Sequence, residues 1–467
     1  MGSTKDPFGG TPMQVNVDVR LVVSISNEGC SVDELCARIG AVLGPIGVKV
    51  AEKVIEAVQH NLFLAAEEGK APPAIMEHPR KGGGKESRCC GGGYVGAGWR
   101  GTVRRIRTEF GEVGMRVRQV MCKSCGKRFA PLLSFLSMRA KRHTSGLERV
   151  VVECITADSF RPGLRTLSTV TGIQLPATTA HHWWATGPWN DVPFGAEEAV
   201  ETLMADGTGF KGRAGKKGEI KVAIGFTREG RAVGLGTWAG TSWKRIGDEI
   251  REGLKRQKEK PLFGVTDGER DLADHLAKLV NHTQRCTWHG GRDLGFALWE
   301  DGVSKPQRDG LVSELRGVLG IEIPAEDWEK VPEDKKAAVR ARLDAARAQG
   351  KELEQGLRDS RCPKAAGYVA RLLEKAFTHV ELWLELGITL PRTTSFLEGR
   401  MFKIGRRVKK IAWNWSDDGA ARMSRVLLKR ALEPKAWLDW CRKQLCPEER
   451  CYVGLVSVTV SHVTGFV

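Results

Sequence analysis

Residues 203–209, LMADGTG, and residues 263–270, FGVTDGER, determine how this 467-residue chain can build a central sheet. In each stretch a short apolar run ends in an aspartate, Asp206 or Asp267, and a glycine follows at once. Such a run is typical of a strand buried in a parallel or mixed sheet, which delivers the carboxylate to the rim of that sheet. The alternative is an ordinary turn, because most single Asp-Gly pairs are turns.

The sequence between the two aspartates favours the sheet. Residues 219–238 alternate polar and apolar side chains around the turn Thr-Arg-Glu-Gly, which predicts a hairpin. Apolar residues at helical spacing follow at Trp243, Ile246 and Ile250. We therefore expect strand, hairpin, helix and strand in that order, in an α/β fold with a mixed sheet whose first and fourth strands each end in an acid.

Two carboxylates at a sheet rim also suggest a chemistry. Joined by a third acid, they form the usual cage for Mg²⁺ or Mn²⁺, because hard cations prefer several oxygen ligands and leave room for a phosphate. Two such ions can bind the attacking and leaving oxygens of a phosphodiester. Asp206 and Asp267 therefore predict metal-dependent phosphodiester chemistry.

Two later motifs complete a pattern that resembles a known family. Residues 393–398 read TTSFLE and end in a third acid, Glu398. Cys286 and His289 form a Cys-x-x-His between the second and third acids. From about residue 88 to about residue 430 the chain resembles prokaryotic insertion-sequence transposases of the Mutator-like group, whose DDE catalytic domain has an RNase H-like fold.

The resemblance implies a role for each of these side chains. Asp206, Asp267 and Glu398 would be the three catalytic acids and would bind two Mg²⁺ or Mn²⁺ ions. Cys286 and His289 would lie near the active site. Two ligands without a second pair do not complete a zinc site, so the role of the Cys-x-x-His stays open.

Glu398 also has a purely structural interpretation. Ser395 and Glu398 have the spacing of a capping box, in which the glutamate only satisfies a backbone N–H. A basic helix after Glu398 favours catalysis, because basic side chains beside the third acid would hold the phosphates of DNA, although most basic runs are solvated faces. The residues predicted to contact DNA on this helix are Arg400, Lys403, Arg406, Arg407 and Lys409.

Composition points to the same partner. The formal net charge is +17, and phosphate backbones are the commonest reason for such an excess of Lys and Arg. We expect a homo-oligomer bound to double-stranded DNA, at element ends and target. No apolar stretch approaches membrane-spanning length, no secretory signal is visible, and the twelve cysteines are scattered. We therefore expect no membrane partner and a cytoplasmic, nucleoid-associated protein with reduced thiols.

A pair of cysteine motifs predicts a zinc-ribbon-like segment ahead of the core. Cys122 and Cys125 form a Cys-x-x-Cys knuckle, and Cys89 and Cys90 precede it across Arg-rich, strand-like sequence. The arrangement resembles the zinc ribbon of such transposases, except that the first two cysteines are adjacent. Either His78 assists zinc binding, or the site is weakened, or the segment is a metal-free relic.

A candidate helix-turn-helix follows the ribbon. Residues 147–157 and 159–170 read as two helices, Gly172 supplies a turn, and a third helix runs from Pro176 through Trp184. The alternative is a three-helix packing element without DNA contacts. The residues predicted to contact DNA in this region are Arg161, Arg165, Thr178, Thr179 and His181.

The interval between Asp267 and Glu398 is longer than an uninterrupted core needs, and its composition predicts a helical insertion. The expected order starts with a helical region behind a disordered leader (1–80), the ribbon-like segment (81–140) and the helix-turn-helix (141–198). The core (199–299), the helical insertion (300–388), the C-terminal helix of the core (389–430) and a tail (431–467) complete it.

These features favour a DNA transposase that cleaves and transfers DNA strands at the ends of an insertion sequence. One rival is another RNase H-like nuclease, such as a resolvase, which would share the acids but need neither the Cys-x-x-His nor the ribbon. The other is a non-catalytic DNA-binding regulator derived from a transposase. Acids at all three positions, Asp206, Asp267 and Glu398, count against the regulator.

Overall fold

The structure is a computed structural model that describes residues 17, 19, 32–70, 90, 92–136, 142–194, 199–255, 257, 259–410 and 414–445. Two compact units divide the chain: Met1–Thr186 with Cys441–Val467, and Gly187–Trp440. The predicted strand at 15–24, the apolar strand at 455–463, His78 and Cys89 fall largely or wholly outside the described residues. No helix within the described ranges is long and apolar enough to cross a membrane.

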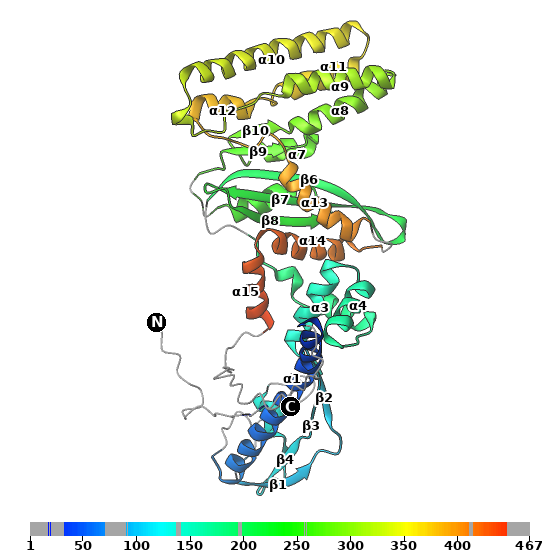
Figure 1. Cartoon of the computed structure of the whole chain (residues 1–467), viewed down its shortest axis with the longest axis vertical. Coiled ribbons are helices and arrows are strands. Elements are labelled where there is room, and N and C mark those ends of the chain that lie inside the picture. Colours follow the sequence, from blue (N-terminus) through cyan, green and yellow to red (C-terminus); the bar gives the residue numbers. More distant parts are fainter. Residues whose placement is uncertain are drawn as a thin grey trace, which may run out of the picture. The chain divides into compact units, whose positions relative to one another are not determined.

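The N-terminal unit contains a long helix, short antiparallel strands and a group of three helices (Figure 1). Its strands are β1 (Tyr94–Trp99), β2 (Arg104–Thr108), β3 (Gly111–Met115), β4 (Arg118–Cys122) and β5 (Arg128–Phe129). They form a sheet of order β1-β4-β5 and a separate β2-β3 hairpin. β1 includes the end of the Gly-rich stretch 81–98, whose composition is typical of a linker.

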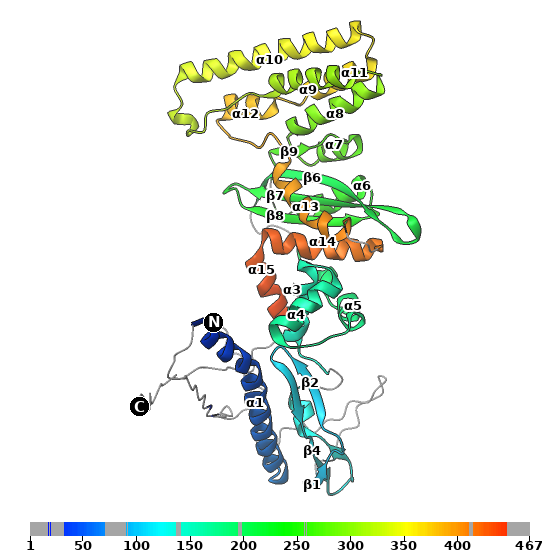
Figure 2. The same ribbon diagram turned by 45° about the vertical axis from the view of Figure 1, so that its right-hand side comes forward.

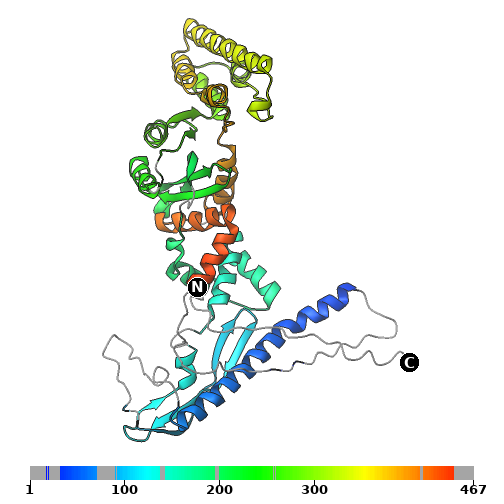
Figure 3. The same ribbon diagram turned by 90° about the vertical axis from the view of Figure 1, so that its left-hand side faces the viewer.

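One long helix forms the helical region predicted near the N-terminus. α1 (Val32–Glu67) runs without interruption through Pro45. It runs along β1, β3 and β4 (Figure 3). Leu62 and Phe63 bury their side chains with Val120 of β4. This apolar contact stabilises the C-terminal half of the helix, since each fully buried side chain of this size contributes about 1.5–3 kcal/mol.

Three helices follow the strands where the sequence predicted them. α2 (Pro131–Phe135) is a short turn of helix, and the group itself consists of α3 (Ser145–Ala157), α4 (Phe160–Thr171) and α5 (Ala177–Thr186). Gly172 ends α4 with φ +71°, a left-handed conformation that glycine adopts without strain. The three helices contact one another in every pairing.

The second unit is built on a five-stranded mixed sheet. Its strands are β6 (Val200–Lys211), β7 (Lys217–Thr227), β8 (Ala232–Ala239), β9 (Phe263–Thr266) and β10 (His282–Arg285), in the order β10-β9-β6-β7-β8. β9 is parallel to β6 and β10, whereas β7 is antiparallel to β6 and β8. The predicted strand, hairpin, helix and strand are thus all present, with α6 (Trp243–Gly253) as the helix.

β6 does not end at Asp206, so that prediction was wrong. The strand continues to Lys211 because β7 pairs with it as far as Lys211↔Lys217. The parallel pairing of β6 with β9 stops at Met204↔Val265. Asp206 therefore lies just beyond the parallel part of the sheet, inside a longer antiparallel ribbon.

Different helices cover the two faces of the sheet. Ala205 packs in a core cluster with Trp243 of α6, so Asp206, the next residue of the strand, points to the opposite face. There α13 lies against β6 (Figure 2). The Phe396 ring of α13 is 4.9 Å from the Phe226 ring of β7. The helices that flank or follow the sheet are α7 (Arg270–Leu276), α13 (Ser395–Val408), α14 (Asp417–Leu432) and α15 (Pro434–Leu445).

A helical subdomain separates β10 from α13, as predicted. Its helices are α8 (Thr287–Glu300), α9 (Lys305–Leu319), α10 (Glu333–Asp359), α11 (Pro363–Leu373) and α12 (Thr378–Leu386). α10 is one continuous helix, and α11 and α12 are two separate shorter helices. Leu294 and Leu298 of α8 lie in the same apolar core, so the subdomain begins before residue 300.

Candidate active site

Asp206 is a part-buried carboxylate on the face of the sheet that α13 covers. Its Oδ1 accepts a hydrogen bond from the Gly207 N–H at 2.7 Å. Burial raises the pKa of Asp206 to about 7, and the negative charges of Asp267 and Glu398 add to the increase. The Gly207 N–H and His289 act in the opposite direction. The charges of Asp267 and Glu398 are therefore near enough to Asp206 to affect its pKa.

Asp267 directly follows β9, as predicted, and its Oδ1 accepts the Glu269 N–H at 2.9 Å. Gly268 has φ +86°, and a Cβ there would lie 0.8 Å from Nη1 of Arg285. Only glycine lets the Arg285 guanidinium pack against this turn. The Asp-Gly pair is therefore a turn as well as a strand end, and the two interpretations of the sequence are compatible.

Glu398 lies in the first turn of α13, but not as part of a capping box. Thr394, not Ser395, is the N-cap residue of the helix. The Thr394 hydroxyl donates to Oε1 of Glu398 at 2.9 Å, whereas the Thr394 N–H donates to Sγ of Cys286 at 3.4 Å. The carboxylate thus does not satisfy the N-cap N–H, which removes the structural alternative raised by the sequence.

Cys286 and His289 contact the segment that carries the third acid. Cys286 is the N-cap residue of α8, His289 lies in its first turn, and both side chains are buried. Nδ1 of His289 is 3.7 Å from Oε1 of Glu398. The buried Thr394 Oγ1 lies 3.4 Å from both Cys286 Sγ and His289 Nδ1. The Cys-x-x-His is therefore part of the same site as Glu398.

The Cys286–His289 contact changes the acidity of both groups. Burial raises the pKa of the Cys286 thiol, but hydrogen bonds with His289 and Thr394 more than offset this, so the pKa is lowered overall. Burial acts to lower the pKa of His289, yet the interaction with Cys286 raises it overall. Each of the two groups therefore stabilises the charged form of the other.

Thr394 is the residue of this site that sequence reasoning missed. It is fully buried and hydrogen-bonds or contacts Cys286, His289 and Glu398. Its position at the start of the predicted acid-bearing helix was the available signal, because N-cap threonines orient nearby groups. The sequence could not indicate that the same hydroxyl would reach a cysteine on a different helix.

The basic helix predicted after Glu398 is α13, and some of its basic side chains are exposed whereas others are buried. Lys403, Arg406 and Lys409 are exposed, and Arg400 is part-buried with its guanidinium 3.5 Å from the Phe396 ring centre. Arg407 is only 4% exposed and lies over the Trp415 ring. Its prediction as a DNA contact was wrong, because it follows Ile404 by three positions and so shares the packed side of α13.

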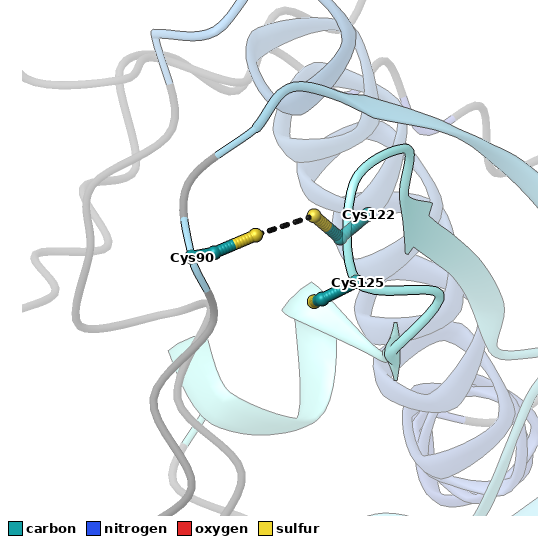
Figure 4. Close-up of side chains that lie close together, drawn as sticks. All are labelled: Cys90, Cys122 and Cys125. Carbon is teal, nitrogen blue, oxygen red and sulfur yellow. Dashed lines mark hydrogen bonds between the residues drawn. The ribbon is translucent and has the colours of Figure 1, made fainter.

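The ribbon-like segment brings three cysteines together (Figure 4). Cys122 ends β4 and Cys125 lies in the turn that follows, where the Gly126 N–H donates to the Cys122 carbonyl at 3.0 Å. Sγ of Cys90 is 3.5 Å from Sγ of Cys122, and the three sulfurs lie within 4.8 Å of one another. A hydrogen bond from Gly92 lowers the pKa of Cys90, but the other two thiols raise it more.

The predicted contacts of the three-helix group lie mostly at its surface. Arg161 and Arg165 are exposed on α4, and Thr178 and His181 are exposed on α5. Thr179 is part-buried. The His181 ring lies 5.5 Å from the Phe160 ring, so the histidine also packs against α4. Their contact with DNA stays a prediction.

Comparisons with known proteins give little further information. No protein-family model and no curated protein matches the chain. Among solved structures, it is similar to the Drosophila P element transposase strand transfer complex, with 11% sequence identity over 67% of this chain and 83% of that chain. The TM-score is 0.25, which identifies neither a family nor an activity for this chain.

Proposed function

We propose that the chain is a DNA transposase that cleaves and joins DNA strands at the ends of an insertion sequence, using Asp206, Asp267 and Glu398. One observation carries the proposal: Asp206 and Asp267 lie just beyond the paired ends of β6 and β9, and α13, which contacts β6, supplies Glu398. The three acids come from separate segments of the chain, and one of them is a buried carboxylate with a raised pKa. Buried groups with perturbed pKa values are typical of functional sites.

The strand arrangement supports the RNase H-like interpretation. β6 is central, the β7-β8 hairpin extends the sheet on one side, and β9 and β10 extend it on the other, parallel to β6. This arrangement brings the residues after β9 beside the end of the parallel part of β6, where Asp206 lies. α13 covers the same face and supplies Glu398.

The donor set fits Mg²⁺ or Mn²⁺. Three carboxylates are oxygen ligands of the kind that hard cations prefer. The raised pKa of Asp206 reflects burial and repulsion by Asp267 and Glu398, both of which a bound dication would counteract. Two ions held there would activate the attacking oxygen and stabilise the leaving oxygen of a phosphodiester.

Other side chains of the protein would position Glu398 and the DNA. The Thr394 hydroxyl holds the Glu398 carboxylate at 2.9 Å and fixes its direction. Lys403 and Arg406, which are exposed on the same helix, would neutralise DNA phosphates and orient the scissile bond. No protein nucleophile is required, since a water and then the freed 3′ hydroxyl supply the attacking oxygens.

The basic face of α13 predicts a salt effect on DNA affinity. Replacing Lys403 and Arg406 with Gln removes two phosphate contacts and should flatten the slope of log affinity against log salt by about one to two units. Arg251→Gln is the control, because this exposed arginine lies on α6, which covers the other face of the sheet. Fluorescence anisotropy across a salt series measures the slope, and an unchanged slope would place α13 away from DNA.

We also propose that Cys90, Cys122 and Cys125 bind zinc. Their sulfurs already lie within 4.8 Å of one another, which lets one ion contact all three. Hydrogen bonds with Cys122 and Cys125 raise the pKa of Cys90, and a bound cation would act in the opposite direction by stabilising the thiolates. The double variant Cys122→Ser, Cys125→Ser should lose about one zinc per chain relative to wild type. Metal analysis of both proteins checks this, with Cys154→Ser as a control; equal zinc contents would exclude the site.

Activity on DNA that carries the sequences flanking the coding region distinguishes the transposase from the two alternatives, a resolvase and a non-catalytic regulator. The transposase should cut at the element ends and join the freed 3′ ends to a target in the presence of Mg²⁺ or Mn²⁺. Cutting of branched DNA without joining would favour a resolvase. Binding to the ends without any cutting would favour a regulator.

A further inference from the structure

The strongest unexplained feature of the molecule is the cluster around the Cys-x-x-His. Cys286, His289 and Glu398 each offer one ligand atom, and within the part of the chain that the structure describes these atoms lie within 4.8 Å of one another. They are a sulfur, a nitrogen and an oxygen from α8 and α13, two helices far apart in the sequence. The proposed magnesium chemistry uses only the oxygen.

Three distances among these side chains match those between ligands of a tetrahedral ion. Bond lengths of ~2.0–2.3 Å to sulfur, nitrogen and oxygen place neighbouring ligand atoms ~3.3–3.8 Å apart. His289 Nδ1 and Glu398 Oε1 are 3.7 Å apart. Thr394 Oγ1 lies 3.4 Å from Cys286 Sγ, 3.4 Å from His289 Nδ1 and 2.9 Å from Glu398 Oε1. The Thr394 hydroxyl oxygen therefore lies near the fourth corner of a tetrahedron around the ion.

We propose that Cys286, His289 and Glu398, closed by the Thr394 hydroxyl, form a binding site for one thiophilic divalent cation such as Zn²⁺. Sequence alone provided two ligands, which do not complete a site, and the fold supplies the third and the fourth position. Cys-x-x-His spacing at a helix start directs both donors to one side, because the N-cap residue and the third helical residue are neighbours there.

This cation differs in class from the proposed catalytic ions. Mg²⁺ binds oxygen and would recruit neither the thiolate of Cys286 nor the imidazole of His289. Zn²⁺ binds all three donor types. Because Glu398 belongs to both sets, a zinc ion in this site would draw the carboxylate away from the magnesium cage. Zinc would then inhibit strand cleavage.

Zinc stoichiometry tests the site without reference to DNA. The full-length wild type, dialysed against buffered Zn²⁺, should bind about one equivalent more than Cys286→Ser, which keeps the side-chain size and can still accept the Thr394 N–H. His289→Gln should lose the same equivalent and guards against a folding defect peculiar to one variant. Cys362→Ser, at a buried cysteine of the helical subdomain, should bind as much zinc as the wild type.

Cobalt(II) gives an independent reading of the ligands. Co²⁺ bound by the wild type should show thiolate charge-transfer absorption that weakens by the same amount in Cys286→Ser, whether or not the cysteines of the ribbon also bind metal. The proposal is overturned if wild type, Cys286→Ser and His289→Gln bind equal zinc. It is also overturned if the lost equivalent leaves the cobalt spectrum unchanged, because the metal would then not contact the thiolate.

The expected inhibition of strand cleavage by zinc rests on the proposed function and is tested by a separate experiment. Zinc added to wild type in Mg²⁺ should abolish most strand cleavage, whereas His289→Gln should keep a larger fraction of the cleavage rate that it shows without zinc. Failure of the wild type to cleave at all would count against the proposed function while the zinc stoichiometry still decides the metal site. Equal inhibition of wild type and His289→Gln, with a difference in zinc binding, would overturn the link between the two sets of ligands.

Discussion

Asp206→Asn and Asp267→Asn should each reduce Mg²⁺-dependent strand cleavage by about 10³-fold or more, since the loss of metal-bound charge removes several kcal/mol of transition-state stabilisation. The amide keeps the shape of the side chain but not the negative charge that binds the ion. Fold and binding to the element ends should be retained. Cleavage of end-labelled DNA measures the effect in single turnover.

Asp274→Asn provides the matched control for these substitutions. Asp274 is an exposed aspartate of α7, only a few residues beyond Asp267, and α7 packs against α6 on the other face of the sheet. This variant should cleave like wild type. Cleavage that survives Asp206→Asn would remove the buried carboxylate from the chemistry, and loss of cleavage in Asp274→Asn would make the comparison uninformative about a metal site.

Without metal, the stability of the second unit should depend on the protonation of Asp206. Burial, followed by repulsion from Asp267, raises the pKa of Asp206 to about 7 in the folded state, compared with about 3.9 in an unfolded chain. The folded state therefore binds this proton more tightly. Its stabilising contribution is complete below about pH 4 and is lost as the pH rises through about 7. The full loss is on the order of 4 kcal/mol.

Asp206→Asn should remove this dependence. In EDTA, the free energy of unfolding of the wild type should fall between pH 5 and pH 8 more steeply than that of the variant, so that the variant becomes the more stable protein at pH 8. Denaturant unfolding followed by tryptophan fluorescence measures both curves. Mg²⁺ at pH 8 should recover stability in the wild type alone. Parallel curves for the two proteins would mean that Asp206 has no raised pKa.

The sequence predicted the sheet well because local patterns determine it. The β7-β8 hairpin follows from alternating side chains and a Thr-Arg-Glu-Gly turn, and β9 follows from a short, wholly buried run before Asp267. The length of β6 could not be predicted in this way. It depends on how far β7 pairs beyond Asp206, which is a contact between strands and not a property of the LMADGTG stretch.

The candidate site was predictable as a set of residues but not as a set of contacts. The three acids and the Cys-x-x-His could be found from their motifs, whereas the contact of Cys286 and His289 with Thr394 requires α8 and α13 to meet. Composition likewise could not separate Arg406 from Arg407. Their exposure differs because Arg407 shares the packed side of α13 with Ile404 and lies over the Trp415 ring.

Glu398 is the residue on which the proposed activity depends most, because a capping-box interpretation of this glutamate competed with catalysis. The decisive measurement is single-turnover cleavage of DNA carrying the element ends by wild type and Glu398→Gln across a Mg²⁺ titration. Gln can still accept the hydrogen bond from Thr394, so the fold of the α13 start is kept. We predict binding of the ends at wild-type affinity and no cleavage at any Mg²⁺ concentration. Cleavage at the wild-type rate would contradict the account and move the third acid elsewhere.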